Sequence, residues 1–232
     1  MKTSRRNWMR MASAGGTGLA LAPAAPAARN EESGAAALLE LFPKRQSVRR
    51  YKSDAVPEEH LRLILDAARR APTCMNQQPW KFLVILDKEK IAKMRQRLTE
   101  IAVKPIEDKL KQQANVNQED LEPRNRAIAT VEGYMSAPVY VVVLTDNQCM
   151  CGLEYAKHDG PMAAGYLMLA ARALGYGTVY LTDTVPENLM REVWNVPDRY
   201  HRVCVTPIGV PDGWPPPKAK KKLEELVAWE TL

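Results

Sequence analysis

The chain has 232 residues, of which 46% are hydrophobic and 26% charged, and its formal net charge is +6. This is the composition of an ordinary globular protein that can bury one sizeable core, so we expect a single domain after the N-terminal segment. The four cysteines are too few and too scattered for a disulfide scaffold in a chain of this length.

The first 28 residues have the pattern of an export signal. Ser4, Arg5 and Arg6 precede a weakly apolar stretch of Ala, Gly and Leu, and small residues suited to cleavage follow in APAAPAA. The paired arginines indicate the twin-arginine route, and therefore a periplasmic or otherwise exported protein. The apolar stretch is too short and too rich in Gly, Ala and Pro to span a membrane, so we expect no stable insertion. A disordered basic tail is the alternative.

This segment also accounts for most of the basic charge. Residues 1–28 hold four of the 33 basic residues and no acidic one, which leaves 29 basic against 27 acidic residues and a net charge of +2. Net charge alone therefore gives little support to a nucleic-acid partner, and we expect none.

The pattern downstream of the signal predicts helices that alternate with strands. Residues 29–39 are expected to form a linker and the start of the first helix, and residues 40–232 one domain. Pro57 opens a second helix with apolar residues at helical spacing. The sequence WKFLVIL, residues 80–86, is typical of a buried strand.

Residues 87–135 are long, polar and rich in helix formers, with breaks expected at Pro105 and Pro123. We interpret them as a mobile helical cap. The strongest strand pattern, APVYVVVLTD at 137–146, follows directly and is apolar enough to be covered on both faces.

An Ala- and Gly-rich segment at 159–177 is apolar nearly all round, which indicates a central helix that packs on every side, including against a copy of itself. The remaining elements are a strand at 178–182, a helix at 186–194 and a strand at 203–210. Strands separated by helices predict an α+β fold with a central mixed sheet covered by helices.

Two basic clusters lie near opposite ends of this domain. Arg45, Ser47 and Arg49 alternate, so in an extended segment they share one side and can offer two guanidinium groups and a hydroxyl to an anion such as a phosphate. Lys218 and Lys220 alternate after a run of prolines. Taken alone, each cluster has a solvated charge run as its alternative.

Other common sites are not indicated. The sequence has no GxGxxG or GxxxxGKS motif, the pair Cys149 and Cys151 lacks the two-residue spacer of zinc and redox pairs, and the three histidines are isolated from one another. We therefore expect no metal centre.

Together, three groups of residues resemble the nitroreductase family of FMN-dependent oxidoreductases over about residues 40–230. They are Arg45-x-Ser47-x-Arg49-x-Tyr51, then Ala71-Pro72-Thr73 with Asn76-x-Gln78-Pro79-Trp80-x-Phe82, and a tail with Pro-Lys-x-Lys. The resemblance implies a nitroreductase-like, intertwined α+β homodimer with two FMN sites at the subunit interface, and with residues 87–135 as the cap over each active site.

The resemblance also implies roles for individual positions. Arg45, Gln46 and Ser47 would hold the FMN phosphate or ribityl chain, Arg49 would reach the pyrimidine edge of the ring, and Lys218 and Lys220 would bind the phosphate. The flavin contacts expected from the second subunit are Pro72, Thr73, Cys74 and Asn76, with a small buried thiol as the alternative for Cys74. Tyr180 and Leu181 would face the other side of the ring, with core packing as the alternative for Tyr180.

The function that this implies is hydride transfer, through flavin N5 and without a catalytic side chain, to a small electron-poor acceptor such as a nitroaromatic, a quinone or an activated alkene. The electron donor would be NAD(P)H or an unknown periplasmic reductant. Reductive dehalogenation of halogenated phenols is one alternative, for which Lys104, Glu119 and Tyr134 of the cap are available. A non-catalytic flavin-binding protein and a surface that binds anionic polymers are the others.

Overall fold

The computed structural model describes residues 27–113 and 115–231, so most of the predicted export signal lies outside the described part. From Leu38 to Leu232 the chain forms one compact unit. The first helix, α1, spans Ala27–Lys44 and therefore includes residues that the sequence assigned to a linker.

Four strands form the sheet, in the order β1, β2, β4, β3. Their bounds are Trp80–Ile85 for β1, Val139–Asp146 for β2, Gly177–Thr178 for β3 and Tyr200–Gly209 for β4. Every pairing among them is antiparallel. The expected mixed sheet is therefore antiparallel in its four strands, and the one parallel pairing among the described residues is an isolated bridge between Thr178 and Ser47, which lies outside them.

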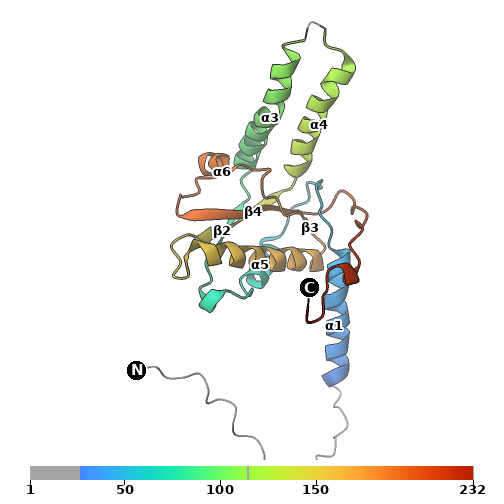
Figure 1. Cartoon of the computed structure of the whole chain (residues 1–232), viewed down its shortest axis with the longest axis vertical. Coiled ribbons are helices and arrows are strands. Elements are labelled where there is room, and N and C mark those ends of the chain that lie inside the picture. The colour runs from blue at the N-terminus through green and yellow to red at the C-terminus, as the bar shows by residue number, and fades with distance from the viewer. Residues whose placement is uncertain (1–26, 114, 232) are drawn as a thin grey trace, which may run out of the picture. The chain divides into compact units, whose positions relative to one another are not determined.

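Helices cover both faces of this sheet (Figure 1). They are α2 (Glu58–Ala68), α3 (Lys88–Leu110), α4 (Gln118–Tyr134), α5 (Gly152–Ala173) and α6 (Glu187–Trp194), with short 3-10 turns η1 at Cys74–Asn76 and η2 at Leu223–Glu225. In the figure α3 and α4 form a pair on one side of the sheet, and α5 runs along the other side.

The central strand β2 explains this arrangement, because successive side chains of a strand point to opposite faces. Val142 and Leu144 belong to the core cluster that includes residues of α3, α4 and α6. Val141 and Val143 belong to the cluster with α2 and α5. The continuous apolar run predicted a strand covered on both sides, and the structure has it.

Two expected boundaries were wrong. Pro105 and Pro123 lie inside α3 and α4, and α3 ends at Leu110 and α4 begins at Gln118. Both prolines are exposed, so the carbonyl that each leaves without a helical partner can bond water. Asn117 sets the start of α4, because it forms a capping box with Asp120.

The strand expected at 178–182 is also shorter than predicted. Only Gly177 and Thr178 pair as β3, and Leu181 makes a separate antiparallel bridge to Val205. The continuous run Val179, Tyr180 and Leu181 gave the strand pattern, whereas the backbone leaves the ladder between these two pairings.

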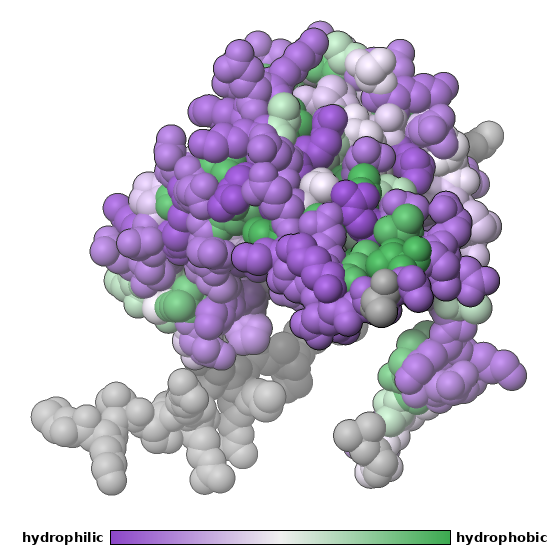
Figure 2. Space-filling model, turned by 90° about the horizontal axis from the view of Figure 1, so that it is seen from above, coloured by the Kyte–Doolittle hydropathy of each residue, from purple (hydrophilic) through white to green (hydrophobic). Residues whose placement is uncertain are grey.

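Hydrophilic residues cover most of the face drawn in Figure 2, with separate hydrophobic patches between them. Large apolar side chains that are exposed in the described residues include Tyr155, Met162 and Tyr166 of α5. None of the described helices is both long enough and apolar enough to cross a membrane.

Candidate functional site

The two basic clusters from opposite ends of the chain lie together around one cavity. This basic cavity has a volume of about 90 Å³. It is lined by Arg45, Gln46, Ser47, Arg49, Pro215, Pro216, Lys218 and Lys220. Lys221 and Lys222 are not among the lining residues, so Lys218 and Lys220 are the tail lysines that face the cavity.

The segment that carries Arg45, Ser47 and Arg49 is fixed by backbone pairing. Val48 N–H donates to Thr178 O at 2.9 Å, and Lys52 N–H donates to Val210 O at 2.9 Å. Val48 is buried, so the side chains of Ser47 and Arg49 on either side of it are directed outward in this extended segment. A Cβ at Gly177 would lie 2.7 Å from Cγ2 of Val48, so this close approach requires glycine.

Arg172, in the last turn of α5, joins the two ends of the chain that form the cavity. Its Nε donates to the carbonyl O of Lys44 at 3.0 Å, and its guanidinium lies 3.9 Å from the ring centroid of Trp214. Lys44 directly precedes Arg45, and Trp214 directly precedes Pro215. Sequence reasoning missed this residue; its only signal is an arginine near the end of a largely apolar helix.

Arg49 is oriented by neighbours at the edge of the cap. Its Nη1 donates to Ser47 O at 3.1 Å, and its Nε donates to the hydroxyl of Tyr134 at 3.1 Å. A Cβ at Gly133 would lie 2.9 Å from Arg49 O, so α4 approaches this segment closely. Tyr51 secures the other side, because its hydroxyl donates to Val48 O at 2.6 Å.

Arg49 lines both the basic cavity and a larger one, which in turn shares residues with a third. A cavity of about 380 Å³ is lined by Arg49, Arg50 and residues of α4 that include Arg126, Thr130 and Tyr134. The same three α4 residues also line a cavity of about 550 Å³ between α3 and α4, here called the cap cavity. Its other lining residues are Leu98, Ile101, Ala102, Pro123, Ala127, Val131, Asp183, Thr184 and Pro186.

The loop at 71–82 is held against the start of α5. Cys74 N–H donates to both carboxylate oxygens of Asp159 at 3.2 Å, and Met150 N–H donates to Oε1 of Gln77 at 2.9 Å. Trp80 is buried against Ala71 and Ala163 and anchors the loop. Three non-glycine residues of this loop have positive φ, namely Met75 at 49°, Asn76 at 55° and Gln78 at 48°.

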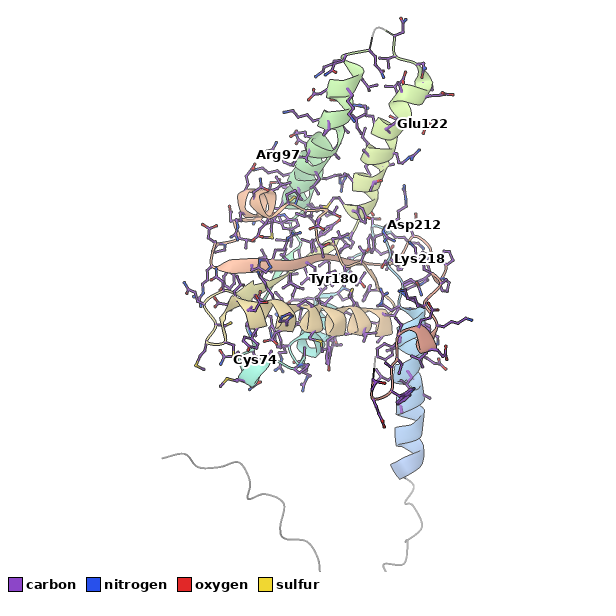
Figure 3. All side chains as sticks on the ribbon, viewed as in Figure 1. Cys74, Arg97, Glu122, Tyr180, Asp212 and Lys218 are labelled. Carbon is purple, nitrogen blue, oxygen red and sulfur yellow. The ribbon has the colours of Figure 1, made fainter. Side chains whose placement is uncertain are left out.

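Within one chain this loop does not reach the basic cavity. Cys74 and Lys218 lie at opposite ends of α5 in Figure 3. The structure therefore brings together Arg45, Gln46, Ser47, Arg49, Lys218 and Lys220, and leaves Pro72, Thr73, Cys74 and Asn76 elsewhere. The resemblance implies this separation of the loop from the basic cavity, because it assigns the loop to the flavin of a second subunit.

Tyr180 and Leu181 lie on the segment between β3 and α6. Tyr180 is half-buried against the α5 side of the core, where burial raises the pKa of its hydroxyl to about 12. The side chain of Leu181 is buried, and its N–H and C=O both bond Val205, at 3.1 and 2.9 Å. Both backbone polar groups of Leu181 are therefore engaged in this pairing.

Within the described residues, no group of three or more His, Cys, Asp and Glu side chains is arranged to hold a metal ion. The charged groups that converge are cations around a small cavity, and the cavity of about 380 Å³ links it to the larger, mostly apolar cap cavity through shared lining residues.

The model of the nitroreductase family matches residues 43–210, which include the first basic segment, the loop and all four strands. The chain belongs to the nitroreductase family. This match covers most of the compact unit, and the sequence resemblance is confirmed at the level of the family.

Relatives within the family share a quarter to a third of their residues with this chain. An iodotyrosine deiodinase from Thermotoga neapolitana is 30% identical over 195 residues, 84% of this chain and 98% of that protein. An NADH dehydrogenase from Thermus thermophilus is 27% identical over 202 residues, 80% of this chain and 92% of that protein.

Solved nitroreductase-like structures have the same fold. An oxidised iodotyrosine deiodinase bound to FMN and 3-iodo-L-tyrosine has a TM-score of 0.66 at 25% identity and covers 84% of this chain and 100% of its own. A structure from Desulfovibrio desulfuricans in complex with FMN has a TM-score of 0.62 at 25% identity and covers 84% of this chain and 97% of its own.

If Arg172 holds the tail on the basic cavity, changing Arg172 to Met will release residues 214–222. The change removes a charge-assisted hydrogen bond and a cation–π contact, together worth about 1–3 kcal/mol. We expect trypsin to cleave the tail at Lys218–Lys222 about tenfold faster or more. Arg69→Met, which removes an exposed arginine paired with Asp66, is the control. Equal cleavage of the two variants would remove Arg172 from this role.

Proposed function

We propose that this protein is an FMN-dependent oxidoreductase that passes a hydride to a small electron-poor acceptor such as a nitroaromatic, a quinone or an activated alkene. The observation that carries the proposal is the convergence of Arg45, Ser47, Arg49, Lys218 and Lys220 on one cavity from opposite ends of the chain. Membership of the nitroreductase family and the FMN-bound neighbouring structures support it.

The residues around the basic cavity fit a flavin phosphate. Four cationic side chains and one hydroxyl line a small space, which suits a doubly charged anion with several acceptor oxygens. Lysine supplies charge without the bidentate geometry of arginine, so Arg45 is the residue that can orient the phosphate and the two lysines neutralise it. Bound FMN would supply hydride transfer at N5 of its ring.

Arg49 would stabilise the negative charge on the pyrimidine edge of the reduced ring. A cation that is already oriented costs little reorganisation when charge develops beside it. The carbonyl of Ser47 and the hydroxyl of Tyr134 hold Arg49 from two sides. Hydride transfer at such a site depends on how the flavin and the acceptor are stacked and oriented. No side chain of the protein is therefore assigned as an acid, base or nucleophile.

We also propose that the protein is a homodimer in which α5 packs against its copy. Tyr155, Met162 and Tyr166 are 55%, 46% and 41% exposed, and their spacing of seven and four residues puts them on one face of α5. The loop lies at one end of α5 and the basic cavity at the other. Two antiparallel copies would place each loop beside the cavity of the partner, which completes two sites.

The cap cavity is the proposed acceptor site. Its lining is mostly apolar, with Arg126, Thr130, Tyr134 and Asp183 as polar groups, and it adjoins Arg49 through the cavity of about 380 Å³. A flat apolar molecule with one or two polar substituents fits such a lining.

Reductive dehalogenation of a halogenated phenol is the second candidate, favoured by the similarity to the deiodinase of Thermotoga neapolitana. Of the three cap residues available to hold a zwitterionic substrate, Tyr134 lines the cap cavity and Lys104 and Glu119 do not. This arrangement favours a simple electron-poor acceptor. Iodide release from 3-iodo-L-tyrosine by the reduced protein would instead establish the second candidate.

Residues 1–28 are proposed to be a twin-arginine export signal, with the mature protein in the periplasm. The motif at Arg5 and Arg6 supports this proposal. The twin-arginine route also carries folded proteins, so FMN could bind to the protein before export. NAD(P)H is a cytoplasmic pool, so a periplasmic protein would use another reductant in the cell even if NADPH reduces it in the test tube.

The absorption spectrum of the purified protein, before and after anaerobic NADPH addition, tests the proposed function. We expect a flavin spectrum that bleaches. A flavin spectrum that persists with NADPH but bleaches with dithionite would point to another donor or a carrier. A colourless protein that cannot take up FMN would overturn the proposal.

Two tail variants are matched controls for this experiment. Lys218→Ala removes a cation that lines the basic cavity, whereas Lys222→Ala removes one that does not. We expect FMN to bind about tenfold or more weakly to the first variant and with unchanged affinity to the second, because one charge-assisted contact is worth about 1.5–3 kcal/mol. An equal loss of FMN affinity in both variants would indicate that the tail attracts FMN through its overall charge and not through a specific contact of Lys218.

Met162→Glu tests the dimer, because it places a charge in the centre of the proposed interface. Light scattering after size-exclusion chromatography should give the mass of two chains for the wild type and of one for the variant, which should also lose FMN. Leu86→Glu, at a leucine that is 53% exposed outside α5, is the control and should remain dimeric. A monomeric wild type that retains FMN would refute the interface.

The export signal is tested by cell fractionation. The wild-type chain should reach the periplasm of a bacterium with the twin-arginine pathway, and a variant with Arg5→Lys and Arg6→Lys should remain in the cytoplasm. Equal distribution of the two would contradict the twin-arginine assignment.

A further inference from the structure

Three of the four cysteines lie on the segments that meet at the start of α5. Cys74 belongs to the loop, and Cys149 and Cys151 to the turn that leads into α5. Their side chains are free and neither fully buried nor fully exposed, whereas Cys204 is fully buried in the sheet. The proposed flavin site uses no thiol chemistry, so this cluster requires a separate explanation.

Cys74 and Cys151 are in direct contact although they are 77 positions apart in the sequence. The Cys151 thiol donates to the carbonyl O of Cys74 at 3.8 Å. The proximity of Cys74, and then desolvation, raise the pKa of Cys151 to about 11. Cys149 is directed differently, and its thiol donates to Gly152 O at 3.3 Å.

The backbone around this contact is held from several sides. Cys74 N–H bonds the carboxylate of Asp159, and Gln77 accepts from Met150 N–H. Met75, Asn76 and Gln78 have left-handed backbone conformations, which non-glycine residues adopt at a cost and keep only where surrounding contacts impose them. The loop is thus already docked in the arrangement that places the Cys151 thiol against the Cys74 backbone.

We propose that Cys74 and Cys151 are a redox site that forms a reversible disulfide by exchange with a low-molecular-weight disulfide such as oxidised glutathione. The Cys74 thiolate attacks one sulfur of that disulfide, which forms a mixed disulfide and releases one thiol. The Cys151 sulfur, after loss of its proton, then attacks the Cys74 sulfur and releases the second thiol. Two protein thiols are oxidised and one external disulfide is reduced.

The order of attack is assigned from Cys151. Its raised pKa lowers its thiolate fraction, and the thiolate is the attacking species, so Cys151 takes the later, resolving step. Cys151 then acts as the resolving cysteine because its sulfur lies beside the Cys74 backbone. The bridge would tie η1 covalently to the turn that leads into α5. In an oxidising compartment the bridged form would predominate.

Thiol counting on the full chain tests this site without reference to flavin. The reduced protein is equilibrated with oxidised glutathione, denatured and alkylated, and its mass is measured. We expect two of the four thiols to be lost with no glutathione attached. All four thiols retained at every glutathione ratio, or a stable glutathione adduct, would overturn the proposal.

Peptide mapping identifies which two cysteines form the disulfide. Trypsin releases Cys74 in residues 71–81 and both Cys149 and Cys151 in residues 127–157. In Cys149→Ser the crosslink between these peptides should persist, and in Cys151→Ser it should be absent. Cys204→Ser is the control for a buried thiol and should leave the crosslink unchanged. A bridge in the wild type that contains Cys149 would also overturn the assignment.

Discussion

The guanidinium of Arg172 is the contact on which the basic cavity depends. One side of this group bonds the backbone where α1 ends, and its face lies against Trp214, where the C-terminal tail begins. Each basic cluster taken alone would be a solvated charge run. With Arg172 bridging their neighbours, and with Asp212 N–H donating to Arg50 O at 3.1 Å, the two clusters meet around one cavity, and their mutual repulsion there is a cost that an anionic ligand would relieve.

The sheet supplies the rigid frame for this contact. Because β2 is covered on both faces, its register decides which residues face α3 and α4 and which face α5. The segment with Arg49 then pairs with Thr178 and Val210 at the edge of the sheet, where Gly177 leaves room for Val48. A cavity lined by long, flexible cations thus rests on a backbone that is hydrogen bonded at both ends.

Elements with a strong local pattern could be predicted from the sequence. The apolar run of β2, the apolar spacing in α2 and the alternation of Arg45, Ser47 and Arg49 are all visible within a short window. Features that depend on distant contacts could not. Arg172 is identified only by what Lys44 and Trp214 bring to it, and Pro105 and Pro123 are tolerated because their helices expose them to water.

The central helix α5 shows why one chain does not complete the proposed site. Its buried face, with Ala163, Ala164 and Leu167, packs on the sheet, and its opposite face exposes Met162 and Tyr166. The loop is strained and anchored at the first end of this helix, and the cations gather at the last. A helix that carries complementary halves of a site at its two ends is completed most simply by an antiparallel copy, since one twofold axis then forms both sites at once.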